Sequence, residues 1–177
     1  MGGMVSAIYL SIGSNGVGPD GAAPARMTQR AMEKILAMEG AGEIGRGRLY
    51  HTEPQGKTDQ PWFVNSALAL RMQIEPIRLL HRLQDIEKEL GRTPGERWGP
   101  RVIDIDIIFI DDVVMTTEEL TIPHPLASQR RFVLAPLADI DPGLAHPVSG
   151  KTVAELLAAL PADAQPIRLV DPSTETS

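Results

Sequence analysis

A strand that carries two carboxylates constrains the fold of this chain most strongly. From Val102 to Ile110 the residues are apolar and mostly β-branched, as in a buried strand, and Asp104 and Asp106 interrupt them. Because residues two apart leave a strand on the same side, both carboxylates share one face. The opposite face is then apolar, with Ile103, Ile105, Ile107 and Phe109. Two unpaired carboxylates side by side in a buried place are unfavourable, so their charge must be compensated.

A divalent cation is one way to compensate this charge, because aspartate oxygens are ligands that Mg²⁺ prefers. Salt bridges to nearby arginines, or a solvent-facing half of an edge strand, are the alternatives. Basic residues do stand nearby in sequence: Arg92, Arg97 and Arg101 before the strand, and Arg130 and Arg131 after it. Arginine suits phosphate oxygens, so a polyphosphate arriving with Mg²⁺ fits this pattern, although a solvated basic loop would fit it too.

The composition of the chain excludes several classes of protein. The 177 residues carry a formal net charge of -6, which argues against general nucleic-acid binding. The chain has no cysteine, so disulfides, thiolate metal sites and a cysteine nucleophile are excluded. No apolar run approaches the roughly 20 residues that span a bilayer, and the start lacks the basic region of a signal peptide. We therefore expect a cytoplasmic protein without a membrane partner, folded as a single domain over 1–177, with about 161–177 as a loosely ordered tail.

The order of the expected elements indicates the fold class. Periodicity predicts strands over 5–12, 44–52, 63–72 and 102–110, and helices over 27–38 and 76–90. This β-α-β-β-α-β order is typical of an α+β, ferredoxin-like antiparallel sheet with two helices on one face. Asp111 and Asp112 predict a hairpin turn into 113–115, and helices follow over 130–139 and from Thr152, whose Thr-x-x-Glu pattern is a capping box.

Two further elements carry candidate ligand-binding residues. Phe63 and Asn65 share one face of the 63–72 strand, where an aromatic ring and an amide could bind a flat heteroaromatic ligand. Core packing of Phe63 and a capping role for Asn65 would explain the same pattern. Gln84 and Glu87 share a stripe of the 76–90 helix, so Glu87 could face the same site as Asp104.

Taken together, the motifs resemble one enzyme family, the 6-hydroxymethyl-7,8-dihydropterin pyrophosphokinases of folate biosynthesis. The matching stretches run in the same order over roughly residues 5–160: Ile12-Gly13-Ser14-Asn15, Asp59-Gln60-Pro61 through Asn65, Gly91-Arg92, Arg97-Trp98-Gly99-Pro100-Arg101, Asp104-Ile105-Asp106, Pro123-His124 and Arg130-Arg131-Phe132. The run from Arg97 to Asp106 is the most specific of them. The resemblance implies transfer of pyrophosphate from ATP to the pterin hydroxymethyl group, with release of AMP.

The resemblance also implies roles for individual residues. Asp104 and Asp106 would hold two Mg²⁺ ions that bridge the ATP phosphates, and with Arg92 and Arg101 they would form the catalytic set. The ATP-binding residues would be Gln84, Glu87, Arg92, Trp98, Arg101, Ile107, Thr121, His124 and Arg130. The pterin would contact Thr52, Glu53, Pro54, Phe63, Asn65, Asp104 and Phe132, with its ring between the two phenylalanines. No dedicated base is implied, since positioning and metal proximity suffice.

The sequence departs from the family pattern at two places. Thr93-Pro94-Gly95-Glu96 lacks basic residues that relatives often carry, and Phe63 stands where tyrosine is common. We expect the segment from Arg92 to Trp98 to be mobile and to close over ATP.

The alternative functions are a Mg²⁺-dependent nucleotidyl transferase with a ferredoxin-like palm and a non-catalytic ligand-binding module of that fold. We expect a monomer, with a dimer as the alternative.

Overall fold

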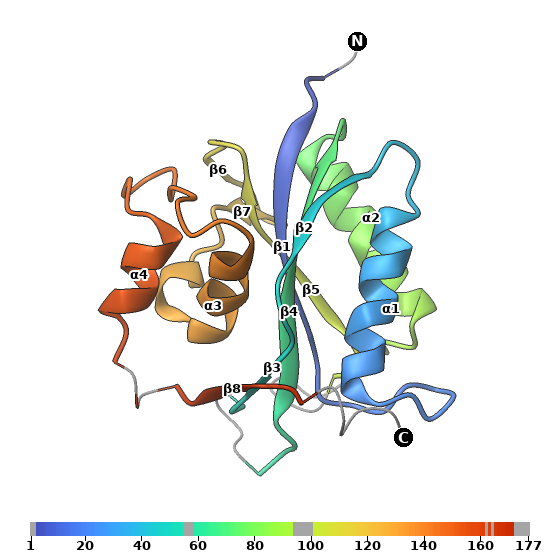
Figure 1. Cartoon of the computed structure of the whole chain (residues 1–177). Helices are drawn as coiled ribbons and strands as arrows, with labels where there is room; N and C mark the ends of the chain where they lie inside the picture. Colours follow the sequence, from blue (N-terminus) through green and yellow to red (C-terminus); the bar gives the residue numbers. More distant parts are fainter. Residues whose placement is uncertain (1–2, 55–58, 94–100, 162, 164, 172–177) are drawn as a thin grey trace.

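The computed structural model describes residues 3–54, 59–93, 101–161, 163 and 165–171 (Figure 1). Its strands are β1 (Ser6–Ser14), β2 (Gly42–Arg46), β3 (Tyr50–Thr52), β4 (Phe63–Met72), β5 (Asp104–Ile110), β6 (Met115–Thr116), β7 (Thr121–Ile122) and β8 (Ile167–Leu169). Its helices are α1 (Pro24–Leu36), α2 (Pro76–Glu89), the 3₁₀ turn η1 (Ala127–Gln129), α3 (Arg131–Ile140) and α4 (Val153–Ala159).

One antiparallel sheet organises these elements. Its strands lie in the order β5-β1-β4-β3-β8, and β2 pairs with β4 beyond the end of β3. The first six elements of the expected layout appear as β1, α1, the β2/β3 segment, β4, α2 and β5. The expected α+β fold with a ferredoxin-like antiparallel sheet is confirmed.

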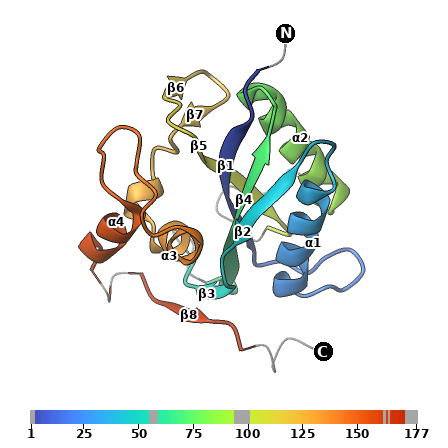
Figure 2. The same cartoon turned by 45° about the horizontal axis from the view of Figure 1, so that its top comes forward.

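Helices cover both faces of this sheet. Figures 1 and 2 show α1 and α2 against one face, and α3 and α4 against the other. Each face has its own apolar cluster: Leu68 and Leu70 of β4 pack on the α1/α2 side, and Ala67 and Ala69 pack on the α3 side. The alternation that the sequence predicted for β4 is therefore correct, and the small alanines mark the face that meets α3. None of the helices in the described ranges is long and apolar enough to cross a bilayer.

The expected strand over 44–52 is wrong in one respect, because it is interrupted. β2 ends at Arg46 and β3 begins at Tyr50. Between them Gly47 passes so close to α3 that a Cβ at this position would lie 2.6 Å from the carbonyl oxygen of Pro136. The backbone still bonds to β4 here, through Gly47 N–H to Ala67 O at 2.9 Å. The close contact of Gly47 with α3 thus interrupts the strand between β2 and β3.

The prediction for Phe109 is also wrong, because β5 contains a bulge. Tyr9 pairs with Phe109 and Leu10 with Ile107, so Ile108 is an extra residue on β5. A bulge reverses the alternation of side chains beyond it. Phe109 therefore belongs to the cluster on the α3 side, with its ring edge-to-face against Tyr9 at 6.5 Å, whereas Ile105 and Ile107 pack on the α1/α2 side as predicted.

Three other expectations have mixed outcomes. The turn after β5 forms at Asp111, but β6 pairs with β7 in a separate two-stranded sheet and not with β5. The N-cap bond of the predicted capping box is confirmed, since Thr152 Oγ1 accepts a hydrogen bond from Glu155 N–H at 3.1 Å. We expected a loosely ordered tail from Pro161, but its described part contains β8, which pairs with β3 through residues 167–169.

A polar network fixes the C-terminal half of α3 to the sheet. Asp139 of α3 accepts hydrogen bonds from the Tyr50 hydroxyl at 2.8 Å, from Arg48 N–H at 3.0 Å and from the Arg48 guanidinium at 2.8 Å. Burial alone would raise the pKa of Asp139, but these hydrogen bonds outweigh it and hold the pKa below its ordinary value of 3.8. Burial, with Asp139 nearby, raises the pKa of Tyr50 to about 12. The contact therefore needs an ionised carboxylate and a neutral phenol.

We expect Asp139→Asn to lower the free energy of unfolding at pH 7 by about 1–2 kcal/mol, because hydrogen bonds to a charged group are lost. A lowered folded-state pKa stabilises the fold above the ordinary aspartate pKa, and this stabilisation disappears as the pH falls through the folded-state value. The difference between the two proteins should therefore shrink below about pH 4. Urea unfolding at several pH values measures it, with Asp85→Asn on the exposed side of α2 as the control. An equal difference at every pH would contradict this role.

Candidate active site

The two carboxylates lie at the start of β5, on the face of the sheet that α3 covers. Asp104 is paired with Gly13 of β1, and Asp106 is paired with Ser11. Across β1, Gly13 is paired with Asn65 of β4, which is itself paired with Tyr50 of β3. The register of four neighbouring strands therefore brings the carboxylates and the Asn65 amide onto one surface of the sheet.

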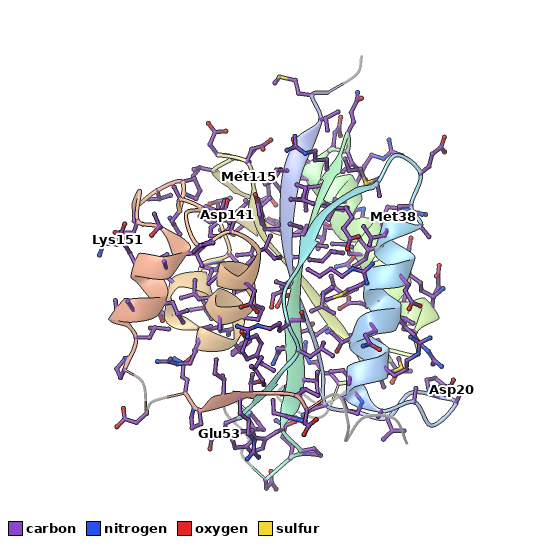
Figure 3. The ribbon with its side chains drawn as sticks, viewed as in Figure 1. Asp20, Met38, Glu53, Met115, Asp141 and Lys151 are labelled. Atoms are coloured by element: carbon purple, nitrogen blue, oxygen red, sulfur yellow. The ribbon has the colours of Figure 1, made fainter. Side chains whose placement is uncertain are left out.

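This surface is the floor of a pocket of about 430 Å³, a size within the range of small-molecule sites. Its walls come from the start of α3, from the segment around His124 and from the ends of β3 and β4. Figure 3 labels Glu53 at the end of the sheet where β3 and β8 lie side by side. The lining residues are Ser11, Gly13, Thr52, Glu53, Gln60, Phe63, Asn65, Arg101, Asp104, Asp106, His124, Pro125, Leu126, Arg130 and Phe132.

Two arginines hold Asp104. Its Oδ1 accepts hydrogen bonds from Arg92 Nη1 at 3.2 Å and from Arg101 Nη1 at 3.3 Å. All three side chains are about one-third exposed, so water and ligands reach this cluster. The salt-bridge alternative for the carboxylate pair is thus present for Asp104.

Glu87 of α2 joins Arg92 to β5. Glu87 is only 5% exposed, and its carboxylate accepts a hydrogen bond from Ile105 N–H at 2.9 Å and pairs with the Arg92 guanidinium. Burial raises the pKa of Glu87, while the bonds from Ile105 and Arg92 act in the opposite direction. Glu87 therefore positions Arg92 beside Asp104 in this structure.

No comparable side-chain bond joins an arginine to Asp106 among the described residues. Burial, with the negative charges of Asp104 and Glu87 nearby, raises the pKa of Asp106 to about 7, although Arg130 and Arg101 partly compensate. The side chain still faces the pocket. A cation bound beside Asp106 would offset the burial and the neighbouring negative charges, and would thereby stabilise its ionised form.

Asn65 is held in a defined orientation. Its Nδ2 donates to Thr52 Oγ1 at 2.5 Å, and it is only 5% exposed. On its other side, a Cβ on Gly13 would lie 2.2 Å from Asn65 Oδ1, so a glycine is required where β1 passes this amide. The Asn65 carboxamide thus occupies the space that a side chain at position 13 would fill.

Asn15 ties two segments that border the pocket. Its Oδ1 accepts from Arg101 N–H at 2.8 Å, while its Nδ2 donates to Gln60 Oε1 at 2.8 Å and to Pro61 O at 3.0 Å. The Asn15 side chain is buried, and its three hydrogen bonds are partly buried. The turn after β1 therefore fixes the segment before β4 and the segment before β5 at the same time.

His124 is attached to the bulge in β5. Its backbone N–H donates to Ile108 O at 3.0 Å, and its Nδ1 accepts from Leu126 N–H at 3.2 Å. Burial and the positive charge of Arg130 lower the pKa of His124. The ring is consequently neutral near pH 7, with Nδ1 as an acceptor and Nε2 as the donor.

Arg130 and Phe132 form the wall opposite the sheet. They lie at the start of α3, and the Arg130 guanidinium stands 5.5 Å from the centre of the Phe132 ring. Phe63 lines the same pocket from β4. The pocket thus combines carboxylates, cations, aromatic rings and one amide.

The predicted site residues fall into three groups. The pocket brings together Thr52, Glu53, Phe63, Asn65, Arg101, Asp104, Asp106, His124, Arg130 and Phe132. Other predicted residues do not line it: Gln84 is exposed on α2, Glu87 and Ile107 are buried, Arg92 reaches Asp104 from outside, Thr121 lies on β7, and Pro54 follows β3. Trp98 and the 94–100 part of the segment that we expected to be mobile lie outside the described residues.

Sequence reasoning missed several lining residues: Ser11, Gly13, Gln60, Pro125 and Leu126. Gly13 and Gln60 stand in motifs that we singled out, but nothing local shows that they face a cavity. The missed strand residues, Ser11 and Gly13, are paired with Asp106 and Asp104, so only the register between β1 and β5 identifies them.

Comparison with known proteins agrees with this geometry. Residues 9–142 match the family model of 7,8-dihydro-6-hydroxymethylpterin-pyrophosphokinase. The chain is 42% identical over 152 residues to a 2-amino-4-hydroxy-6-hydroxymethyldihydropteridine pyrophosphokinase of Methylorubrum extorquens, covering 86% of this chain and 92% of the relative. It is 38% identical over 158 residues to the protein of the same name from Pseudomonas aeruginosa, covering 89% and 94%.

The fold is similar to that of solved structures. The crystal structure of Plasmodium falciparum HPPK-DHPS wild type with pteroate superposes with a TM-score of 0.67 at 16% identity. The match covers 88% of this chain and 42% of that one, so the chain spans less than half the length of this structural relative. The family match and the two full-length relatives together lead to one conclusion: the chain belongs to the 7,8-dihydro-6-hydroxymethylpterin-pyrophosphokinase family.

Proposed function

We propose that the chain transfers the terminal pyrophosphate of ATP to the hydroxymethyl oxygen of 6-hydroxymethyl-7,8-dihydropterin in folate biosynthesis, which leaves AMP and the pterin diphosphate. One observation carries this proposal. A single pocket is lined both by an aromatic and amide set, Phe63, Phe132 and Asn65, and by a carboxylate and cation set around Asp104. A flat heteroaromatic alcohol and a polyphosphate are the two ligands that these sets suit.

The pterin occupies the aromatic part of the pocket in this proposal. Phe63 and Phe132 offer their faces to the ring, where stacking is favourable. The Asn65 amide is preoriented by Thr52 and by the close approach of Gly13, and it hydrogen-bonds to the polar edge of the ring together with Glu53 and the backbone of 52–54. A rigid amide discriminates strongly against ligands that cannot complete its hydrogen bonds.

The ATP phosphates occupy the charged part. Arg101, Arg130 and neutral His124 line the pocket near the carboxylates, and each offers N–H donors to phosphate oxygens. Arg92 is held by Glu87 at the edge of this cluster and joins the phosphate contacts. Gln84, Ile107, Thr121 and Trp98 complete the nucleotide side of the proposal.

The carboxylates suit Mg²⁺. Mg²⁺ binds through one or two carboxylates and keeps its remaining positions for water and phosphate oxygens. Asp104 and Asp106 share a face and line the pocket, and the raised pKa of Asp106 reflects a charge conflict that a cation removes. No group of three or more acidic, histidine or cysteine side chains suited to a metal occurs among the described residues. In this proposal, phosphate oxygens and water supply the other ligands. We propose two ions at this pair.

The step requires one bond to form and one to break. The pterin hydroxymethyl oxygen bonds to the β-phosphorus, the bond from this phosphorus to the oxygen of the α-phosphate breaks, and AMP leaves with that electron pair. The hydroxyl proton passes to solvent or phosphate, since no residue is assigned as a base. Bound Mg²⁺ neutralises charge on the phosphates during this transfer. The chain itself aligns the two ligands and supplies Arg92, Arg101 and Arg130 to the developing charge.

Several broader expectations belong to the same proposal. The chain acts as a single pyrophosphokinase domain and as a monomer, in the cytoplasm, on small-molecule substrates. Its net charge of -6 supports substrates other than nucleic acid.

The nucleotide product tests the reaction type. Incubation with ATP, Mg²⁺ and the pterin should yield AMP and the pterin diphosphate, which chromatography resolves from ADP and pyrophosphate. Asp104→Asn and Asp106→Asn should each reduce turnover at least about a hundredfold without unfolding the protein, since phosphate charge is no longer neutralised. Asp112→Asn, an exposed aspartate beyond the far end of β5, is the control. Release of pyrophosphate would indicate a nucleotidyl transferase, and absence of any product from a folded, ligand-binding protein would indicate a binding module.

The charge conflict at Asp106 has a consequence for stability without metal. A carboxyl group with a raised folded-state pKa destabilises the fold as the pH rises from about 4 to about 7. In EDTA, Asp106→Asn should therefore be more stable than the wild type at pH 8, by at least about 2 °C in Tm, and the difference should vanish near pH 4. Added Mg²⁺ should raise the Tm of the wild type and narrow the gap. A variant that is less stable at pH 8 in EDTA would contradict this assignment.

The aromatic wall is tested by Phe63→Ala. Loss of stacking should weaken pterin binding by roughly 0.5–1.5 kcal/mol, plus a term for lost apolar contact area, while ATP affinity changes little. Calorimetry with each ligand measures both, and Arg71→Ala, exposed on the same strand, is the matched control. Equal losses for the two ligands would mean that Phe63 supports the core and not the pterin.

A further inference from the structure

The chain returns to the pocket after α4. β8 lies beside β3 at the end of the sheet that carries the pocket (Figure 1), and Gln165 stands two residues before it. Resting on the function proposed above, we propose that Gln165 is a positioning residue for the pterin: it holds the backbone on both sides of Arg130 and thereby fixes the wall formed by Arg130 and Phe132.

The amide of Gln165 makes two bonds to the start of α3. Its Oε1 accepts from Arg131 N–H at 2.7 Å, and its Nε2 donates to Gln129 O at 2.7 Å. These partners flank Arg130, and Phe132 follows one residue later. The Gln165 side chain, 34 residues after Arg131 in the sequence, therefore holds the short segment that carries the pocket residues Arg130 and Phe132.

This clamp replaces a local helix cap. The first N–H groups of a helix have no intrahelical partner, and a side chain at the N-cap position usually accepts from one of them. At α3 the N-cap residue is Arg130, whose side chain makes no capping bond among the described residues. Gln165 satisfies the Arg131 N–H instead, which leaves the Arg130 side chain free to face the pocket.

Hydrogen bonds also hold the chain on both sides of Gln165. Before it, the Arg131 guanidinium donates to Leu160 O at 3.1 Å and to Pro161 O at 2.7 Å. After it, Pro166 O accepts from Glu53 N–H at 3.4 Å, and residues 167–169 pair with β3. The segment thus links two pocket walls, β3 with Glu53 and α3 with Phe132, and Gln165 is the link on the α3 side.

The chemistry of the clamp requires an amide of this length. A glutamine offers an acceptor and a donor in one plane, which matches one N–H and one carbonyl. Glutamate keeps the acceptor for Arg131 N–H but places a negative oxygen against Gln129 O. Alanine removes both bonds. The two substitutions therefore separate loss of the whole clamp from loss of the donor alone.

The expected effect concerns pterin binding. We expect Gln165→Ala to raise the dissociation constant for 6-hydroxymethyl-7,8-dihydropterin about fivefold to tenfold, because two hydrogen bonds that orient Phe132 are lost. Calorimetry with a non-hydrolysable ATP analogue present measures this constant. Gln165→Glu should raise it about threefold or more. Asp163→Ala, exposed on the same segment, should bind like the wild type. Thermal unfolding of each protein verifies that it is folded at the assay temperature.

A double-mutant cycle with Phe132→Ala distinguishes positioning from general stability. If Gln165 acts through Phe132, adding Gln165→Ala to Phe132→Ala should cost little further pterin affinity. Fully additive losses, or a Gln165→Ala protein that binds pterin as tightly as the wild type while its Tm falls, would overturn the inference. Should Gln165→Ala fail to fold, Gln165→Glu in the same cycle decides the question. A wild-type protein that does not bind the pterin at all would instead overturn the proposed function, and this inference with it.

Discussion

Charge compensation at the start of β5 is the constraint on which the rest of the site depends. Asp104 and Asp106 leave one face of a buried strand, and of the two only Asp104 has arginine partners within hydrogen-bond distance among the described residues. Asp106 responds with a raised pKa. The same imbalance that makes two neighbouring carboxylates unfavourable makes the pair suitable for a cation, which the proposed function supplies together with phosphates. In the proposed function, the carboxylate pair lowers the intrinsic stability of the protein and provides affinity for ATP and Mg²⁺.

Strand pairing converts this local charge pattern into a pocket. β1 lies between β5 and β4, so its residues Ser11 and Gly13 separate the carboxylates from Asn65 by one strand. Gly13 allows the Asn65 carboxamide to lie close to β1, and Asn15, just after the same strand, bonds to the segments before β4 and β5. The bulge at Ile108 adds a carbonyl that anchors His124. A single central strand and its two neighbours thus position most of the polar groups.

The opposite wall is made by α3, which is attached at both ends. Near its C-terminal end, Asp139 bonds to Tyr50 and Arg48. At its N-terminal end, Gln165 bonds to the backbone around Arg130. Both attachments involve the β3 edge, because Tyr50 belongs to β3 and Gln165 precedes the strand that pairs with it. An aromatic wall that is fixed at two points loses less conformational entropy when a flat ligand stacks on it.

Local periodicity was sufficient for much of this structure. The order of strands and helices, the shared face of Asp104 and Asp106, the shared face of Phe63 and Asn65, and the cap at Thr152 all follow from spacing within one element, and the resemblance to the family rested on short contiguous motifs. The tertiary structure decided the features that depend on contacts between distant segments. The bulge moved Phe109 to the α3 face, α3 interrupted the strand between β2 and β3, Glu87 turned inward while Gln84 stayed exposed, and the C-terminal segment returned as β8. Strand register and helix packing are set by partners far away along the chain, so no local pattern of residues contains them.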